Sequence, residues 1–498
     1  MNVNPITRLD YPDPDVIRVE DTYYMVSTTM HFMPGCEILQ SFDLVHWEHV
    51  TYVYETLDHT DAQQLKSGQN IYGQGMWAAS LRYHEGRFYI CFVANDTRKT
   101  YLYTSEKIDG PWKKQLIEGF YHDGSLLFDE DGRNYIVYGN DEIWITELNE
   151  DLTAPKKDGL HRLLVSDHKN PELGYEGSHI QKINGYYYIF LVHSLRDRWM
   201  RTEACFYSDS LEGEFTGGDV LCDDRGYCGQ GVAQGGIVDT PDGKWYAMLF
   251  QDSGAVGRIP ILLPVTWKDH FPFFGQNGHV PEEIEVHSTR PGYIYQPLVG
   301  SDDFCNGLLP RWQFNHDPDP RYYHLDALQG TYTITTREVC TELTQAVNTL
   351  TQRMSYPSCA AEVTVDASAL KEGDIAGLCA LQSCYAAVGI TKHHGKYEVL
   401  MLDKKEDGIL DMTEGTVVES HQMDFRLEAD FCNMKDEARC YYRVNKGDWL
   451  PIGTVHKLYF KLDHFTGCRF GLFCYAAEET GGSACFRDFK YYDVDEIS

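Results

Sequence analysis

The amino-acid sequence predicts an all-β protein with two domains, a five-bladed β-propeller at residues 1–295 and a β-sandwich at residues 301–498. The first observation behind this prediction is a strand–turn–strand pattern that occurs five times before residue 295. The second is a series of short alternating strands, without that pattern, in the rest of the chain. Helical periodicity is almost absent from the first domain.

Each repeat of the first domain consists of a strand, a tight turn and a second strand that is rich in aromatic residues. The aromatic follows the start of the repeat by 11 or 12 residues, and turns such as Asn184-Gly185 are typical of β-hairpins. The steps between these aromatics are 65, 46, 53 and 58 residues, which is the order of length of a propeller blade. The repeats begin at Asp13, Ala78, Asp123, Glu176 and Gln234.

Three of the five repeats begin with a carboxylate, namely Asp13, Asp123 and Glu176. In a closed ring the same position of every blade faces the same axis, so we expect the three side chains to converge. Each acid alone could be an ordinary turn residue. Three together are better explained by function, because like charges held close together cost free energy. A pair of carboxyl groups on a rigid ring can cleave a glycosidic bond, one as general acid and the other as general base.

The composition is that of a globular protein, and its negative charge favours a neutral ligand over an anionic one. Apolar residues make up 43% of the chain and charged residues 24%, and the formal net charge is −32. Such a charge disfavours nucleic acids and anionic membrane surfaces as partners. Aromatic residues reach 13%, which suits β-strands and also surfaces that stack on sugars.

The 15 cysteines are scattered, without a CxxC pair or the spacing of a zinc site. The first residues show no signal peptide, and no run of 18 apolar residues is present. These features predict a cytoplasmic protein with free thiols and no membrane span.

The second domain follows a change of pattern near residues 291–301. Segments such as Thr331-Tyr-Thr-Ile-Thr and Ala361-Glu-Val-Thr-Val alternate in polarity and predict a β-sandwich of about 200 residues. Because no long linker precedes them, we expect the two domains to pack together. The polar stretch at residues 57–75 is expected to be a long loop, and long loops in compact domains are often functional.

Five motifs in order resemble family 43 glycoside hydrolases. They are Tyr11-Pro-Asp-Pro-Asp, Met76-Trp-Ala-Ala, His122-Asp-Gly-Ser, Tyr175-Glu-Gly-Ser-His and Ser288-Thr-Arg-Pro. The second domain is similar to the lectin-like, concanavalin A-like sandwich of the β-xylosidase branch. The resemblance implies an inverting, exo-acting hydrolase without a required cofactor. Its expected activity is release of terminal β-D-xylosyl and/or α-L-arabinofuranosyl residues from hemicellulose-derived oligosaccharides.

The resemblance also implies roles for individual residues. Asp13 would be the general base, Glu176 the general acid, and Asp123 the residue that orients and tunes Glu176. Further sugar contacts are expected. Residues 30–35 lie where family members carry an aromatic patch at the sugar site, and Met30 stands where an aromatic is frequent. These substrate-binding candidates are Trp77, Arg290, Phe32 and Phe465.

One departure from the family concerns calcium. Gln234 stands where many relatives carry a His that serves a central calcium site, although its carbonyl oxygen would also suit a structural Ca²⁺. Two alternatives stay open, an arabinan-degrading hydrolase and a non-catalytic sugar-binding propeller. The invertase group is disfavoured, because its Asn-Asp-Pro-Asn-Gly, Arg-Asp-Pro and Glu-Cys motifs are missing. The sequence leaves open the choice between xylose and arabinose and whether the chain forms a homo-oligomer.

Overall fold

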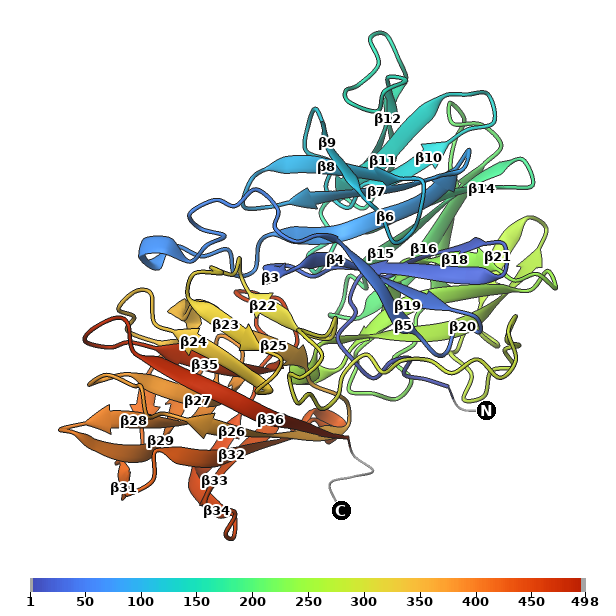
Figure 1. The fold of residues 1–498 in the computed structure, drawn as a ribbon. Coiled ribbons are helices and arrows are strands. Elements are labelled where there is room, and N and C mark those ends of the chain that lie inside the picture. The colour runs from blue at the N-terminus through green and yellow to red at the C-terminus, as the bar shows by residue number, and fades with distance from the viewer. Residues whose placement is uncertain (1–2, 494–498) are drawn as a thin grey trace.

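The computed structural model describes residues 3–493, and β-strands dominate it (Figure 1). Five four-stranded sheets come from residues 15–274, and two larger sheets are built mainly from residues 313–493. The small sheets form a propeller at one end of the molecule, and the large sheets form a sandwich at the other. The predicted fold class is therefore confirmed. Among the described residues, no helix is long and apolar enough to cross a membrane.

Each blade is an antiparallel sheet whose strands follow one another along the chain. The blades comprise, in order, β1 (Asp15–Val19), β2 (Thr22–Ser27), β4 (Gly35–Ser41) and β5 (Glu48–Tyr54); β6 (Met76–His84), β7 (Arg87–Ala94), β8 (Lys99–Ser105) and β9 (Lys113–Ile117); β10 (Ser125–Phe128), β11 (Asn134–Asn140), β12 (Glu142–Leu148) and β13 (His161–Ser166); β14 (Glu176–Ile183), β15 (Tyr186–Ser194), β16 (Arg201–Ser208) and β17 (Thr216–Leu221); β18 (Val232–Asp239), β19 (Trp245–Asp252), β20 (Arg258–Lys268) and β21 (Phe271–Phe274).

The first strands of the five blades surround the propeller axis. Strand β1 contacts β6 and β18, β10 contacts β6 and β14, and β14 contacts β18, so the ring is closed. The N-terminal segment strengthens the closure on blade 5. Asn4 Nδ2 donates to the Leu262 carbonyl at 2.7 Å, and the Leu262 N–H donates back to Asn4 Oδ1 at 2.8 Å.

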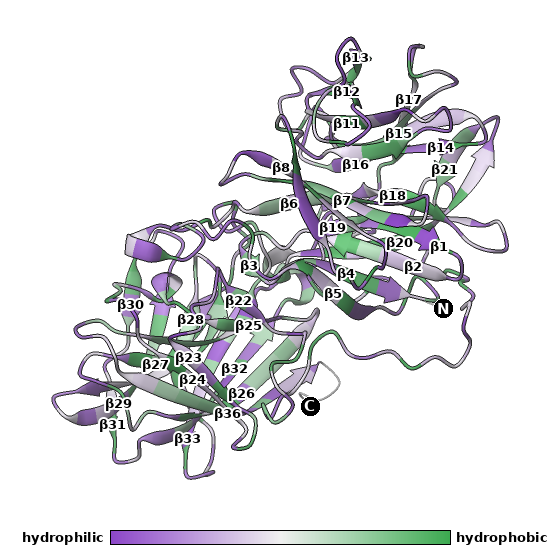
Figure 2. Cartoon of the chain, turned by 45° about the horizontal axis from the view of Figure 1, so that its top comes forward, coloured by the Kyte–Doolittle hydropathy of each residue, from purple (hydrophilic) through white to green (hydrophobic). Residues whose placement is uncertain are grey.

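The hairpin turns explain how the local sequence builds each blade. Asn184 and Gly185 have φ values of 51° and 84°, the left-handed pair that a two-residue type I′ turn requires and that Asn and Gly adopt most readily. The following strand β15 is almost entirely buried. In Figure 2 hydrophobic residues concentrate in the strands and hydrophilic ones in the turns, so the blades pack through their faces.

The sandwich consists of a nine-stranded and a seven-stranded sheet. Fully buried side chains such as Phe425, Phe470 and Phe486 belong to the core cluster of this domain. The strands of the larger sheet are β3 (Phe32–Met33), β22 (Gln313–Asn315), β25 (Leu350–Arg353), β35 (Arg469–Tyr475), β27 (Ile375–Leu381), β28 (Ala386–His393), β29 (Lys396–Lys404), β30 (Leu410–Met412) and β31 (Thr416–Val418). Those of the smaller are β23 (Tyr323–Asp326), β24 (Thr331–Thr335), β36 (Ser483–Asp493), β26 (Ser358–Asp366), β32 (Gln422–Asp430), β33 (Glu437–Val444) and β34 (Leu450–Lys457). Four 3₁₀ turns complete the described chain, η1 (Lys66–Gly68), η2 (Gly254–Val256), η3 (Leu343–Gln345) and η4 (Cys432–Met434).

The two domains share backbone pairing. Strand β3 comes from the blade 1 region of the chain, yet it pairs antiparallel with β22 and so forms the edge of the large sandwich sheet. Beside it, Glu37 of β4 forms a buried ion pair with Arg353 of β25 at 2.8 Å. The domains therefore pack together, as the sequence predicted.

Candidate active site

The starting positions of all five repeats line one cavity of about 260 Å³. These positions are occupied by Asp13, Ala78, Asp123, Glu176 and Gln234, so the expected convergence of the three acids is confirmed. The cavity lies at the N-terminal ends of the first strands of the blades. Its other lining residues are Trp77, His122, Asn140, Arg201, Arg258, Leu462 and Phe465.

The backbone aims these side chains by a shared local conformation. Asp13, Asp123 and Gln234 have left-handed φ values of 53°, 47° and 65°, which are uncommon for residues with a Cβ. In blade 4 the left-handed residue is Gly177, one position after Glu176, and the pairing of β14 with β15 shifts register there. Strain of this kind is concentrated at functional sites, and register shifts redirect side chains.

Asp13 is held by two donors that come from different blades. Thr28 Oγ1 donates to Asp13 Oδ2 at 2.6 Å, and Arg258 Nη1 donates to Asp13 Oδ1 at 3.0 Å. Arg258 is the first residue of β20 in blade 5. Each carboxylate oxygen thus has its own partner, and the buried group is fixed in one orientation.

Asp123, Glu176 and His122 form a compact cluster on the other side of the repeat ring. One polar atom from each lies within 4.8 Å of the other two. Asn140 Nδ2 donates to Glu176 Oε2 at 2.8 Å, and the Gly177 N–H donates to Asp123 Oδ2 at 2.9 Å. His122 Nε2 is 3.5 Å from both Asp123 Oδ2 and Glu176 Oε2.

The cluster perturbs the pKa values of two of its members. Burial raises the pKa of Asp123, and the charges of Glu176 and Asp13 raise it further. The His122 cation lowers it, and the resulting pKa of Asp123 is about 6. Burial lowers the pKa of His122, but Asp123, Glu176 and Asp13 outweigh it and raise the value to about 9. His122 is therefore a cation near neutral pH, and it partly balances the three acids.

Two arginines that sequence reasoning missed line the cavity. Arg201 begins β16, its Nε donates to Asp252 Oδ2 at 2.9 Å, and its guanidinium lies 5.2 Å from the Phe250 ring centroid. Arg258 begins β20 and holds Asp13. Each arginine is the first residue of the third strand in its blade. An alignment of the third strands would have revealed this shared position. His122 and Asn140 were also missed, although His122 directly precedes Asp123 in the quoted motif.

Trp77 and Phe465 lie in the cavity, as expected from the sequence. Their ring centroids are 5.5 Å apart, and Trp77 is 5.8 Å from the His122 ring. The buried Trp77 indole N–H has no hydrogen-bond partner among the described residues, so it is free to donate to a bound molecule. Phe465 comes from the sandwich, which therefore supplies part of the cavity wall.

The expectation that Arg290 lies in the substrate pocket is not met. Its Nε and Nη2 donate to the two carboxylate oxygens of Asp21 at 2.8 and 3.1 Å, and its guanidinium covers the Phe42 ring at 4.1 Å. Asp21 belongs to the turn between β1 and β2, at the opposite end of β1 from Asp13. Arg290 is thus an exposed residue held at the end of blade 1 that lies opposite Asp13.

Phe32 does not line the cavity either. Because β3 pairs with β22, the Phe32 side chain is drawn into a sandwich core cluster, where it is 1% exposed and lies 3.4 Å below the guanidinium of Arg469. Met30 is equally buried and pairs with Met76 through its backbone. The aromatic patch that the resemblance placed here is therefore absent from the cavity lining.

The described residues place no group of three or more His, Cys, Asp or Glu side chains around Gln234, where a structural Ca²⁺ was expected. Ca²⁺ takes six to eight oxygen ligands. Within the described chain, the one group of three or more His, Cys, Asp or Glu side chains with metal-like spacing is His122, Asp123 and Glu176. The Gln234 backbone N–H donates to Glu203 Oε2 at 2.7 Å. We assign no step to calcium.

Paired carboxyl groups in a small cavity are the groups that hydrolysis of a glycosidic bond uses. The family model described as glycosyl hydrolases family 43 matches residues 3–272, and the β-xylosidase C-terminal concanavalin A-like domain matches residues 301–492. The chain belongs to glycosyl hydrolase family 43, whose members are inverting, exo-acting enzymes that need no cofactor for catalysis.

Known relatives span the chain almost completely. A bifunctional GH43-CE protein of Bacteroides eggerthii is 42% identical with a TM-score of 0.92; the match covers 99% of this chain but 64% of that protein. A second structure, of a GH43 glycoside hydrolase engineered to display endo-xylanase and exo-arabinofuranosidase activity, is 27% identical, with a TM-score of 0.86 and 99% coverage of both chains. A β-xylosidase of Formosa agariphila is 26% identical over 99% of this chain and 89% of its own length.

Proposed function

We propose that this protein releases single β-D-xylosyl or α-L-arabinofuranosyl residues from the non-reducing ends of hemicellulose-derived oligosaccharides, with inversion at the anomeric carbon. The observation that carries the proposal is the convergence of Asp13, Asp123 and Glu176 in one small cavity. Cavities for drug-sized ligands measure about 300–1,000 Å³. A cavity of about 260 Å³ therefore suits one sugar ring better than a chain.

Asp13 is the proposed general base. Its carboxylate takes a proton from a water molecule, whose oxygen attacks the anomeric carbon on the face opposite to the leaving group. Thr28 and Arg258 fix the orientation of the carboxylate for this step. An inverting enzyme needs about 6.5–9.5 Å between its two catalytic carboxyl groups to admit this water.

Glu176 is the proposed general acid. It gives its proton to the glycosidic oxygen as the bond to the anomeric carbon breaks, so the shortened sugar leaves as a neutral alcohol. Asn140 directs one oxygen of Glu176, and Asp123 stands close enough to influence its proton. Asp123 is thus the proposed tuning residue. The positive charges of His122 and Arg201 offset the electrostatic repulsion among the three carboxyl groups in this buried site.

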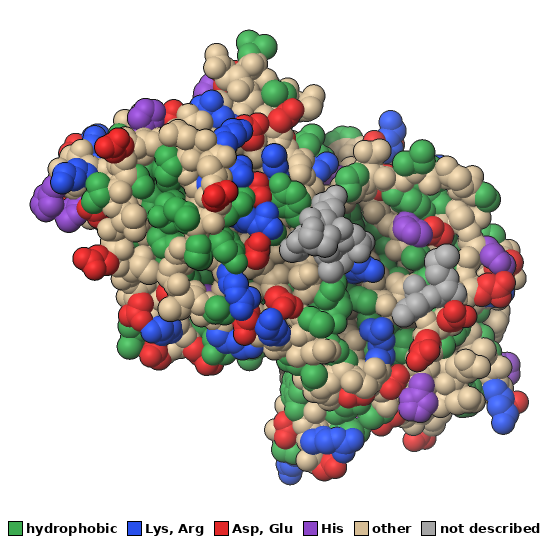
Figure 3. Space-filling view, turned by 90° about the horizontal axis from the view of Figure 1, so that it is seen from below, with side chains coloured by type: hydrophobic (Ala, Val, Ile, Leu, Met, Phe, Trp, Pro, Cys, Tyr) green, Lys and Arg blue, Asp and Glu red, His purple; other side chains and the backbone are tan. Residues whose placement is uncertain are grey.

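The substrate is proposed to be a neutral oligosaccharide. With a net charge of −32 the protein would repel anionic ligands. Figure 3 shows one face of the molecule on which acidic and basic side chains are interspersed, without a broad basic surface for nucleic acid. We further propose that the enzyme acts in the cytoplasm on short imported oligosaccharides, and that dimers or larger homo-oligomers are compatible with this role.

The test is a panel of 4-nitrophenyl pentosides together with short xylo- and arabino-oligosaccharides. We expect release of single pentoses by stepwise shortening, and proton NMR should show the inverted anomer first. The relative kcat/KM for β-D-xyloside and α-L-arabinofuranoside assigns the preferred sugar. Early di- and trisaccharides would instead indicate an arabinan- or xylan-cleaving endo enzyme. Binding without hydrolysis would indicate a sugar-binding propeller. An Asp13→Asn variant serves as the inactive control.

A further inference from the structure

The sandwich contributes to the active-site cavity through one loop, residues 461–467. Leu462 and Phe465 of this loop line the cavity. Phe465 has a left-handed φ of 57°, so the loop must be held from outside to present the ring. Its ring lies 4.3 Å from the guanidinium of Arg258, and its carbonyl accepts from Arg258 Nη2 at 3.4 Å. The loop thus contacts the same arginine that fixes Asp13.

The residue that holds the middle of this loop comes from the propeller. Tyr72 stacks on His464, with ring centroids 3.8 Å apart and an angle of 2° between the planes. The Tyr72 hydroxyl donates to the Thr344 carbonyl at 2.7 Å and accepts from Asn315 Nδ2 at 2.6 Å. Tyr72 is therefore fixed by two sandwich residues before it meets His464. Burial lowers the pKa of His464 to about 3, so the stacked ring stays neutral.

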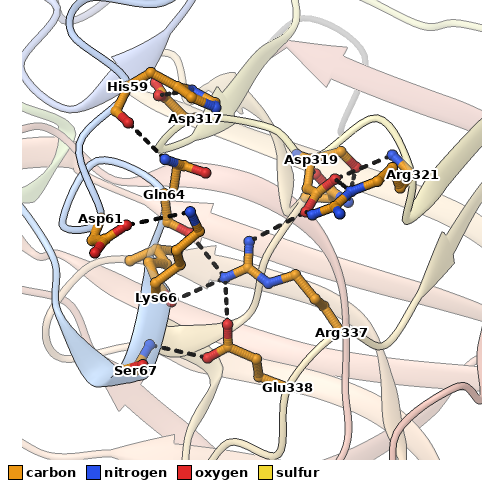
Figure 4. Close-up of polar contacts among 12 residues, drawn as sticks. His59, Asp61, Gln64, Lys66, Ser67, Asp317, Asp319, Arg321, Arg337 and Glu338 are labelled. Atoms are coloured by element: carbon orange, nitrogen blue, oxygen red, sulfur yellow. Dashed lines mark hydrogen bonds and ion pairs between the residues drawn. The ribbon is translucent and has the colours of Figure 1, made fainter.

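Tyr72 belongs to the long polar loop at residues 57–75, whose other end is also attached to the sandwich (Figure 4). His59 Nδ1 lies 2.8 Å from Asp317 Oδ2, and Arg337 Nη2 donates to the Gln64 carbonyl at 2.9 Å. The Ser67 N–H donates to Glu338 Oε2 at 3.1 Å. None of these three contacts involves His464.

The backbone after Tyr72 is adapted to this contact. Gly73 has a φ of 66°, and a Cβ there would lie 2.8 Å from the Leu462 carbonyl oxygen and 2.7 Å from that of Asp463. Only glycine allows the two loops to approach so closely. The propeller loop thus supports the sandwich loop at Leu462 and at His464, on either side of Asp463.

We propose that Tyr72 is a positioning residue for the substrate pocket and that it acts through His464 on Phe465. The proposal rests on the function proposed above and adds a determinant of substrate affinity that lies outside the cavity. Tyr72 does not line the cavity, and its stacking on His464, the neighbour of Phe465, is the contact through which it reaches the pocket.

The test compares four single variants, among them Phe465→Ala, and one double variant in steady-state hydrolysis of an aryl pentoside. Tyr72→Leu should raise KM by about 3-fold to 10-fold, the range in which an aromatic stacking pair contributes to affinity. The kcat should change by less than about twofold, because the three acids keep their places. Tyr72→Phe retains the stacked ring and should restore most of the affinity. Arg337→Met weakens the docking of the same propeller loop without touching His464, and it should lower Tm but leave KM unchanged.

The double variant tests the route of the effect. In a Phe465→Ala background, Tyr72→Leu should raise KM by less than about twofold, because coupled residues are not additive. An undiminished effect of Tyr72→Leu in that background would overturn the proposal, as would an equal rise of KM in Arg337→Met. Turnover by the wild type tests the proposed function separately, so failure of one idea is distinguishable from failure of the other.

Discussion

Replacing Glu37 by Gln should strongly destabilise the junction between propeller and sandwich. Glu37 and Arg353 form an ion pair at 2.8 Å, with side chains that are 3% and 5% exposed. His49 Nδ1 lies 3.0 Å from Glu37 Oε1, and Arg353 Nε donates to the Asp10 carbonyl at 2.9 Å. Removing the carboxylate leaves the Arg353 guanidinium buried without an anion, which costs about 3–5 kcal/mol.

The pKa of Glu37 gives an independent figure for the same pair. Burial raises this pKa, but Arg353 and His49 outweigh burial and lower it from 4.5 to about 2. Because the folded value lies below the unfolded one, the stabilisation is fully present above pH 4.5 and is lost as the pH falls toward 2. The difference between the two pKa values corresponds to about 3 kcal/mol, which agrees with the estimate from the lost partner.

The assay is urea or thermal unfolding of wild type and Glu37→Gln at pH 7 and at pH 3. We expect a large gap in the free energy of unfolding at pH 7 and a smaller gap at pH 3, where the wild type has lost part of its own contribution. Asp21→Asn is the matched control, since it breaks the exposed pair with Arg290 and should cost less than about 1 kcal/mol. A Glu37→Gln variant as stable as this control at pH 7 would refute the reasoning.

Three further predictions concern catalysis. Glu176→Ala should lower turnover of natural xylosides by about 10²–10⁴-fold, but much less for substrates with good leaving groups; equal losses on both would contradict its role as acid. The kcat/KM should rise through about pH 6, where Asp123 ionises. His122→Asn removes the cation that lowers the pKa of Asp123, so this rise should move to higher pH, and an unmoved rise would rule out His122 as the residue that tunes Asp123. Arg258→Met should lower kcat/KM by about 10-fold to 100-fold, whereas Arg290→Met should change it by less than about twofold; similar losses would restore Arg290 to the site.

The repeat pattern predicted the propeller and the convergence of its acids because both depend on local spacing. A strand, a turn and a strand at fixed intervals place Asp13, Asp123 and Glu176 at equivalent points of a ring, whatever the intervening loops do. Arg201 and Arg258 could not be found in this way, since they belong to third strands that the pattern did not cover.

The wrong assignments have a different physical origin. Phe32 lies near the expected place in the chain, but β3 pairs with β22, and Phe32 lies opposite Asn315, 283 residues later. This pairing turns the Phe32 ring into the sandwich. Arg290 forms an ion pair with Asp21, which lies at the end of blade 1 opposite Asp13. Both outcomes depend on contacts between segments that are distant in sequence, and neither local periodicity nor motif spacing carries that information.

The strand shared between the domains has a consequence for any attempt to shorten the protein. A propeller cut off after residue 295 would lose β22, and the backbone of β3 would be left as an unpaired edge, which invites aggregation. The same cut would remove Leu462 and Phe465 and open the cavity on that side. The sandwich therefore cannot be exchanged like an appended carbohydrate-binding module, and the catalytic unit extends across both domains.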